Sequence, residues 1–416
     1  MRRLVGLFAL AACGDGVPGH DANTTPDATV GLVRLHAAGW RDAEVYFQGP
    51  DSSLVLATRL DGDGEANAYV PPGGFVTLVH RDTFTTVLYT WAAVEPGDVL
   101  ELTAGTPPLD PATMFVSVPP ADPSTFFYQL VSPCGVLSIG GAELEPIPVE
   151  LDQCPSATVG MLVQTFGDGD SYLYRDAVPI QHGTQLAFTG PYQNREPLAV
   201  HAINVPPHSD SPRVQAALLS NGYELFVADD FTTEGGSPGV LNGEVPMPMP
   251  ASATLSWHLQ ATTPSAIGAT TALAWGPPQS SVTLDFGAPL RHYTGTPRYV
   301  PAQHAIRWDE DTVGRVADGV VVALRWDHVS TAESYLWNVS APRSDDPAVR
   351  LPVLPASDLH PGADDLVVAP AVLSNFVVEG GYASVRPYLL DAFDRGRLWP
   401  IRGASGHVVV ETLSPQ

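Results

Sequence analysis

Proline and glycine punctuate this chain from end to end, and their spacing constrains the fold more than any other feature. The 416 residues include 41 prolines and 38 glycines. Proline fixes φ and lacks a backbone donor, and glycine is costly inside a helix, so long helices are disfavoured. Short strands joined by turns suit the pattern, and a hydrophobic content of 44% is ample for packed cores. We predict an all-β fold of tandem antiparallel β-sandwich modules with little helix.

Runs of alternating apolar residues divide the chain into modules. Residues 29–104 predict a first β-sandwich, 111–234 a β-rich middle domain, 235–250 a Pro- and Gly-rich linker, and 251–416 a further β-sandwich. The breaks between runs hold the Gly, Pro, Asp and Asn residues that turns favour. The strands expected in the first module cover residues 29–36, 43–48, 54–60, 65–70, 74–81, 85–92 and 98–103.

The first sixteen residues have the three parts of an export signal. Arg2 and Arg3 supply a positive start, residues 4–12 form an apolar run, and small residues end it. An apolar run of about nine residues is much shorter than the roughly 20 needed to span a bilayer. We therefore expect a signal peptide over residues 1–12 and not a lasting transmembrane helix.

The end of that run, Leu10-Ala11-Ala12-Cys13, resembles the lipobox of bacterial lipoproteins at all four positions. The resemblance implies that Cys13 carries the lipid and becomes the new N-terminus, followed by a flexible tether over residues 13–28. Gly14 stands where some lipoproteins held at the inner membrane have aspartate, so the resemblance implies the bacterial outer membrane. The alternative is an ordinary secretory signal in which Cys13 falls near the cut by chance.

With Cys13 carrying lipid, Cys134 and Cys154 remain as a pair. In an oxidising envelope compartment, two such cysteines favour a disulfide. The alternative, a metal or redox pair, lacks a C-x-x-C spacing and nearby histidines. We predict one disulfide in the middle domain.

The chain is strongly acidic. Twenty Lys and Arg residues face 45 Asp and Glu residues, for a net charge of −25. A protein that binds nucleic acid needs a basic footprint, so we expect no nucleic-acid partner. Attraction to anionic lipid headgroups is disfavoured for the same reason, and we expect contact with the membrane through the N-terminal lipid. The acidity indicates either solubility through self-repulsion or binding of divalent cations.

Two acidic turns are the candidate cation sites. Asp61, Asp63 and Glu65 alternate with glycine, and Asp168 and Asp170 have the same spacing. Asp-Gly is a strong signal for a tight hairpin turn between strands, and a plain hairpin is the prediction at both places. Alternate carboxylates also occur in calcium loops, so a structural Ca²⁺ is the alternative. We expect no other metal or cofactor.

Two segments resemble known sandwich families. The turn Asp61-Gly62-Asp63-Gly64, the run Pro71-Pro72-Gly73-Gly74 and the strand-like residues 75–79 together resemble the carboxypeptidase regulatory-like, or transthyretin-like, domain. That resemblance implies a non-catalytic spacer or packing partner. Residues 321–326 followed by 335–339 resemble strands B and C of fibronectin type III and immunoglobulin-like domains, where an inward aromatic side chain fills the space between the sheets.

No P-loop and no H-E-x-x-H motif organises the polar residues into a catalytic site. Alternation places Tyr89 with Trp91, and Tyr172 with Tyr174, on one face of a strand. Core packing is the prediction for both pairs, and a carbohydrate-stacking platform is the alternative. We therefore expect a lipid-anchored envelope protein with a non-catalytic binding or scaffolding role and an unknown protein or carbohydrate ligand. The alternative function is an exported hydrolase acting on polysaccharide or peptide.

Overall fold

Strands dominate the structure, which confirms the all-β, sandwich-type class. This computed structural model describes residues 31–40, 42–102, 111–121, 125, 127–140, 146–151, 154, 156–166, 171–207, 212–220, 223–231, 239–252, 255–265, 268–329, 333–362, 365–394 and 405–413. Within these residues, the few helical segments are α1 (Gly381–Val385), α2 (Leu389–Asp394) and three single-turn 3-10 helices at Pro301–Gln303, Ser357–Leu359 and Arg386–Tyr388.

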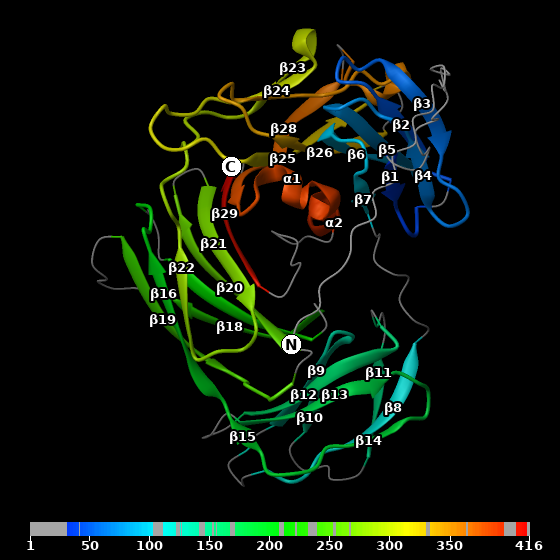
Figure 1. Ribbon diagram of the computed structural model, residues 1–416. Coiled ribbons are helices and arrows are strands. Elements are labelled where there is room, and N and C mark those ends of the chain that lie inside the picture. Colours follow the sequence, from blue (N-terminus) through cyan, green and yellow to red (C-terminus); the bar gives the residue numbers. More distant parts are fainter. Residues whose placement is uncertain are drawn as a thin grey trace, which may run out of the picture.

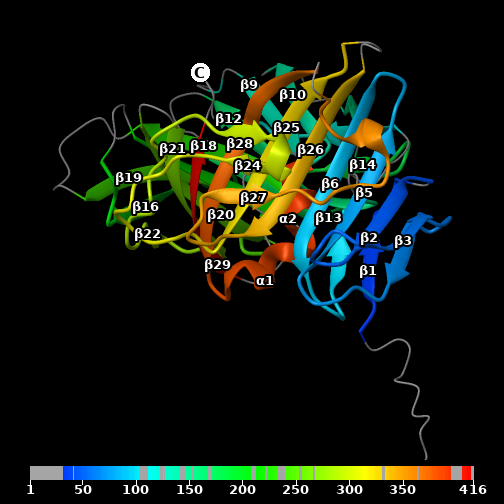
Figure 2. The same ribbon diagram turned by 90° about the horizontal axis from the view of Figure 1, so that it is seen from above.

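A twelve-stranded sheet runs through the molecule and organises the rest (Figures 1 and 2). β18 and β3 are the strands at its two ends. Neighbouring strands are antiparallel except at one seam, where β26 and β6 run parallel. In order across the sheet, the strands are β18 (Tyr223–Phe231), β17 (Arg213–Ser220), β20 (Leu255–Pro264), β21 (Gly268–Gly276), β29 (Gly406–Leu413), β28 (Leu366–Val378), β25 (Gly319–Asp327), β26 (Ser334–Pro342), β6 (Thr85–Val94), β5 (Gly74–Arg81), β2 (Glu44–Gln48) and β3 (Leu54–Arg59).

Three small sheets cover the faces of this large sheet, each closing a hydrophobic core. One sheet lies with α1 and α2 under the β3 end, the second covers the opposite face of the central strands, and the third covers the β18 end. In that order they are β4 (Glu65–Ala68), β1 (Val33–His36) and β7 (Val99–Glu101); β23 (Arg298–Val300), β24 (Ala305–Arg307) and β27 (Ala348–Arg350); and β19 (Val240–Met247), β16 (Glu196–Ile203) and β22 (Ser281–Asp285).

The remaining strands form a sandwich of their own around a fourth core. A five-stranded sheet packs against a three-stranded sheet, and the five-stranded sheet turns its other face toward the β18 end of the large sheet (Figure 1). The five strands are β10 (Gly135–Gly140), β9 (Phe127–Ser132), β12 (Thr158–Phe166), β13 (Ser171–Pro179) and β15 (Gln193–Asn194), and the three are β11 (Ile147–Leu151), β8 (Ala112–Ser117) and β14 (Gln185–Ala187).

The parallel seam joins the first module to the last one. Trp337 Nε1 on β26 donates to Thr90 Oγ1 on β6 at 2.8 Å, and both side chains are buried. Beside the seam, the Tyr382 hydroxyl lies 3.0 Å from the carbonyl oxygens of Ala92 and Ser340. The borders predicted for the modules therefore do not coincide with the borders of the sheets, because strands far apart in the sequence complete one another's ladders.

The seven strands expected in the first module are present as β1 to β7, but the hairpin predicted at residues 61–64 is wrong. The turn itself forms: Gly64 N donates to Asp61 O at 3.0 Å, and Gly64 has a φ of 78°. However, β3 pairs with β2, whereas β4 pairs with β1 in another sheet. The turn is a corner between two layers. The hairpin prediction failed because the conformation of a turn does not specify which strand each of its two flanking strands will pair with.

The predicted linker at residues 235–250 differs from the structure at its centre, where residues 240–247 form β19. Leu241, Val245 and Met247 are buried in the core at the β18 end, so their alternation is that of a strand. Pro246 fits there because β19 is the outer strand of its sheet, and an outer strand can spare a backbone donor.

Strands β25 and β26 cover the segments that resemble fibronectin type III strands. Trp326 and Trp337 are fully buried and point into the same core, as the resemblance implies. The two strands pair directly with each other in one sheet, whereas strands B and C of that family lie in opposite sheets. The resemblance therefore extends to the inward aromatic side chains and not to the pairing.

Candidate ligand groove

The structure confirms the predicted disulfide. Cys134 and Cys154 are bonded, with their Cα atoms 4.3 Å apart, and the bridge ties the β9–β10 turn to the chain before β12. Cys13, with the signal peptide and the tether, lies outside the described residues, and so do Asp168 and Asp170. In the part of the chain that the structure describes, no helix is long and apolar enough to cross a bilayer.

The acidic turn at residues 61–65 uses one carboxylate to shape itself. Asp61 Oδ1 accepts from the backbone N–H of Asp63 at 3.0 Å and of Glu65 at 2.8 Å. Glu65 lies 3.6 Å from His36 Nδ1. Among the described residues, no three His, Cys, Asp or Glu side chains gather in a way that could hold a metal ion.

The aromatic pairs considered as a carbohydrate platform lie mostly inside the protein. Tyr89 and Trp91 share one face, as alternation predicts, but that face is buried in the core under the β3 end. Tyr172 is also buried, and Tyr174 packs against the same core. The platform alternative is therefore wrong for Tyr89, Trp91 and Tyr172.

An open groove of about 570 Å³ lies between the five-stranded sheet and the β18 end of the large sheet. Strands β9, β10 and β12 form one wall and β18 forms the other. Its lining residues are Gln129, Val131, Ser132, Pro133, Gly135, Val136, Gln164, Phe166, Arg195, Glu224, Leu225, Phe226, Val227 and Ala228.

The two sheets come close together beside the groove. At the line of contact β12 has Gly160, where a Cβ atom would come within 2.5 Å of Ser220 Oγ on β17. The Tyr172 hydroxyl accepts from the backbone N–H of Met249 at 3.0 Å, and burial raises the pKa of this tyrosine. A side chain at residue 160 would therefore displace Ser220, so the glycine permits the close approach of β12 to β17.

Aromatic rings and one arginine line the groove. Phe127 stacks on Phe166 with ring centroids 4.5 Å apart and planes 9° apart. The guanidinium of Arg195 lies over Phe166 on one side and Phe226 on the other, at 5.7 and 5.1 Å from the ring centroids. Its Nη2 also donates to Gln164 Oε1 at 2.7 Å. These contacts hold the arginine in place. Phe226 is buried, whereas Arg195 and Phe166 are only partly buried.

Both walls of the groove end in a terminal strand. Among the described strands, β10 pairs with β9 alone and β18 pairs with β17 alone. A terminal strand turns every second N–H and C=O away from its partner, which leaves backbone groups ready to pair with another chain. Val136 on β10 is 60% exposed and Val227 on β18 is 37% exposed, so apolar side chains accompany the open backbone.

Phe166, Arg195 and Phe226 were not predicted from the sequence. Phe166 lies opposite Phe127 through the pairing of β9 with β12. Arg195 and Phe226 reach the groove from the β15–β16 junction and from β18. No local pattern marks these residues, because long-range strand pairing brings them together.

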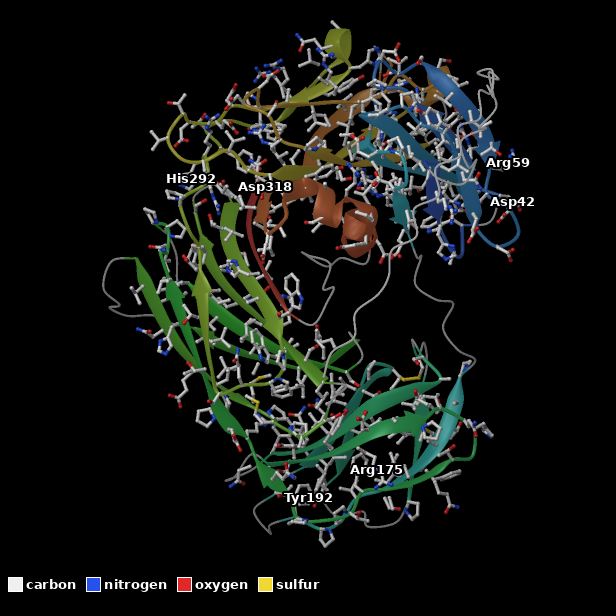
Figure 3. The ribbon with its side chains drawn as sticks, viewed as in Figure 1. Asp42, Arg59, Arg175, Tyr192, His292 and Asp318 are labelled. Carbon is white, nitrogen blue, oxygen red and sulfur yellow. A yellow bond between two sulfur atoms is a disulfide. The ribbon has the colours of Figure 1, made fainter. Side chains whose placement is uncertain are left out.

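A second polar constellation lies under the loop before β23. His292 is labelled in Figure 3. Its Nδ1 is 2.9 Å from Glu411 Oε1, and Glu411 lies on β29 near the middle of the large sheet. Burial raises the pKa of Glu411; the hydrogen bond with His292 opposes that increase, and the nearby carboxylates of Asp311 and Glu310 add to it. A cavity of only about 10 Å³ adjoins His292, which is room for roughly one water molecule.

No protein-family model matches the chain, and neither does any curated protein. Among solved structures, the chain is similar to the TIE protein of Bacillus anthracis at 9% identity and a TM-score of 0.15, over 62% of this chain and 50% of that one. It is also similar to a streptococcal ancillary pilin at 9% identity and a TM-score of 0.14, over 61% of this chain and 98% of that one. The chain thus spans about half the length of the first, and likenesses this weak carry no argument.

Proposed function

We propose that this protein is a lipid-anchored envelope protein with a non-catalytic binding role, and that its ligand lies in the groove between β10 and β18. The observation that carries the proposal is the open groove with Phe166, Arg195 and Phe226 in its wall. Rigid aromatic and arginine side chains in a groove are the residues that most often dominate binding energy. The lipobox supports the anchor, and the net charge of −25 leaves lipid as the means of attachment.

A protein segment suits this groove better than a carbohydrate. An extended peptide laid beside a terminal strand gains backbone hydrogen bonds, and its alternate side chains enter the adjoining apolar sites. The groove offers both features, through β10 and β18 and through Val136 and Phe166. A sugar would need several polar groups converging on one ring, whereas the polar groups here, such as Gln129 and Gln164, alternate with apolar ones along the wall.

The test of the ligand site uses two defined probe sets: a displayed library of random peptides and an array of oligosaccharides. We expect peptides to bind the protein, and Phe166→Ala to weaken them by about 2 kcal/mol, or roughly thirtyfold. Val136→Asp, at a position that is 60% exposed, is expected to weaken them too. The matched control is Val313→Asp, because Val313 is equally apolar, is exposed and lies away from the groove.

Each outcome of that test decides something. Peptide binding that Phe166→Ala and Val136→Asp reduce while Val313→Asp does not would support the proposal. Oligosaccharide binding with the same pattern would replace the protein ligand with a carbohydrate. Binding that neither groove variant changes would remove the groove as the ligand site.

The anchor is tested separately by Cys13→Ser in the bacterial host. We expect the variant to leave the membrane fraction and to incorporate no labelled fatty acid, because the thiol that carries the lipid is gone. A variant that still sediments with membranes and still takes up label would contradict the lipid anchor and leave the groove proposal intact.

The exported hydrolase is a second candidate, favoured by the His292–Glu411 pair alone. A histidine oriented by a carboxylate is the arrangement of a general base, but the adjoining cavity is too small for a substrate. Residues 235–239, Gly-Gly-Ser-Pro-Gly, have the spacing of a serine nucleophile turn. The next described element along the chain is the strand β19, whereas that turn is followed by a helix. Peptide or polysaccharide cleavage that His292→Ala abolishes would establish the hydrolase.

A further inference from the structure

We propose that the β3 edge of the large sheet is a contact surface for a second copy of this chain, in a two-fold arrangement centred on Val55. This strand is the opposite end of the sheet from β18, so the contact is independent of the groove. Figures 1 and 2 both show β3 at the outer margin of the molecule. Arg59, at the end of β3, lies on that margin in Figure 3.

Three consecutive large apolar side chains are exposed on β3. Leu54 is 49% exposed, Val55 is 42% exposed and Leu56 is 38% exposed. Terminal strands of stable proteins usually carry charges or prolines that discourage pairing, and none occurs among these three residues. Single exposed apolar residues are ordinary, but a run on a sheet edge indicates a surface that is covered in use.

The strand is complementary to itself. When two copies meet antiparallel about Val55, Leu54 of each copy lies opposite Leu56 of the other and Val55 lies opposite Val55. The same arrangement turns Arg59, at the end of β3, toward the β2–β3 turn of the other copy, which holds Asp51. Each contact of this kind occurs twice in a two-fold dimer. The three apolar residues are therefore flanked on each side by one pair of Asp51 and Arg59.

The charged groups are available for this contact. Asp51 is held by Ser53, whose N–H and hydroxyl both donate to Asp51 Oδ1 at 3.0 and 2.6 Å. These bonds lower the pKa of Asp51, which therefore stays ionised. Arg59 reaches Glu44 only at 3.9 Å and has a largely exposed side chain.

Side chains rather than a long backbone ladder carry the contact. β3 has a bulge at Val55, because Phe47 pairs with Leu56 and Gln48 pairs with Leu54. A bulge bends its strand and interrupts regular pairing. The surface is also smaller than the roughly 20 to 30 residues per side of a stable interface. We therefore expect a weak dimer, best trapped by a cross-link.

The experiment uses the full chain with Cys13→Ser, so that neither lipid nor the native thiol at that position contributes. Val55→Cys places two thiols together at the two-fold centre, and we expect an oxidised dimer on a non-reducing gel. Val313→Cys is the matched control, at another exposed valine. Cross-linking is measured at about 0.15 M salt, where screening within roughly 8 Å limits repulsion between the acidic chains.

Charge reversal then tests the register. Asp51→Arg or Arg59→Asp alone places like charges together and is expected to reduce the cross-linked fraction of Val55→Cys severalfold, whereas both changes together restore it. Circular dichroism confirms that each variant is folded. Cross-linking of Val55→Cys no greater than that of Val313→Cys would overturn the proposal. If neither charge reversal changed the cross-linked fraction of Val55→Cys, the two-fold register would be overturned.

Discussion

A buried ion pair beneath the β23–β24–β27 sheet provides a quantitative test of the packing. Arg343 Nη2 donates to both carboxylate oxygens of Glu310, at 2.9 and 2.7 Å, and the two side chains are only 1% and 4% exposed. The guanidinium lies 4.8 Å from the ring centroid of Trp308, whose Nε1 donates to Glu310 Oε2 at 3.1 Å. Arg291 adds a second cation 3.5 Å from Glu310.

Glu310→Gln is expected to destabilise the protein by about 3 kcal/mol. Removing one member of a buried pair leaves the other charge without its counter-ion, which typically costs roughly 3–5 kcal/mol. Glutamine keeps the volume and one acceptor oxygen, so the lower part of that range applies. The control is Asp346→Asn in the pair of Arg307 and Asp346, whose side chains are 33% and 58% exposed. Its expected cost is about 0–1 kcal/mol, because solvent screens such a pair.

Urea denaturation followed by tryptophan fluorescence measures both variants. We expect Glu310→Gln to lower the midpoint with an unchanged slope. The double variant Glu310→Leu with Arg343→Met should be more stable than Glu310→Gln, because it removes the buried Arg343 charge while Arg291 keeps Asp345 at 3.2 Å. If the losses of unfolding free energy caused by Glu310→Gln and Asp346→Asn differed by less than about 1 kcal/mol, burial would not determine the strength of these ion pairs.

Three further predictions concern stability. His328 Nδ1 lies 2.6 Å from Asp365 Oδ2. Burial lowers the pKa of His328, but the contact with Asp365 outweighs it and the pKa lies above 6.5. Burial raises the pKa of Asp365, but the contact with His328 outweighs it and the pKa lies below 3.8. The melting-temperature difference between wild type and His328→Asn should thus be largest between about pH 4 and 6.5 and shrink as pH rises through the raised pKa; a difference that is constant to alkaline pH would contradict this. Cys134→Ser with Cys154→Ser should cost roughly 3 kcal/mol in urea denaturation, and a reductant should then have no further effect. A Cβ at Gly406 would overlap Cζ2 of the Trp275 ring, so Gly406→Ala should cost about 1–3 kcal/mol, and an unchanged urea midpoint would contradict it.

The parts of this fold that follow from short-range pattern could be predicted from the sequence. Alternation identified β1 to β7, and cysteine arithmetic identified the disulfide between Cys134 and Cys154. Alternation also placed Tyr89 and Trp91 on one face. Each of these inferences concerns residues that are close in the chain or of a rare type.

The choice of partners could not be predicted. Trp337 and Thr90 are 247 residues apart in the sequence yet share a hydrogen bond across the parallel seam. The Asp61–Gly64 turn was expected to join paired strands, but the two arms belong to different sheets. Arg195 follows a strand of two residues, and nothing near it in the sequence indicates the rings of Phe166 and Phe226 that enclose it. These features depend on which strand ladders are completed, and many ladders are compatible with the same alternation.

The two proposed surfaces share one physical origin, the unfinished ends of the twelve-stranded sheet. In the described structure every interior strand of that sheet pairs on both sides, and small sheets cover its faces, so β18 and β3 are where the large sheet still exposes pairing groups. At β18 the neighbouring sandwich stands close enough to make a groove, and aromatic rings line it, so that end suits a guest segment. At β3 no second wall accompanies the strand in the described structure. Its residues are complementary to an antiparallel copy of the same strand, so that end suits an identical strand. A dimer through β3 would leave both grooves open at the far ends of the joined sheets, where one partner with two binding segments, or a surface with many, would engage both copies together.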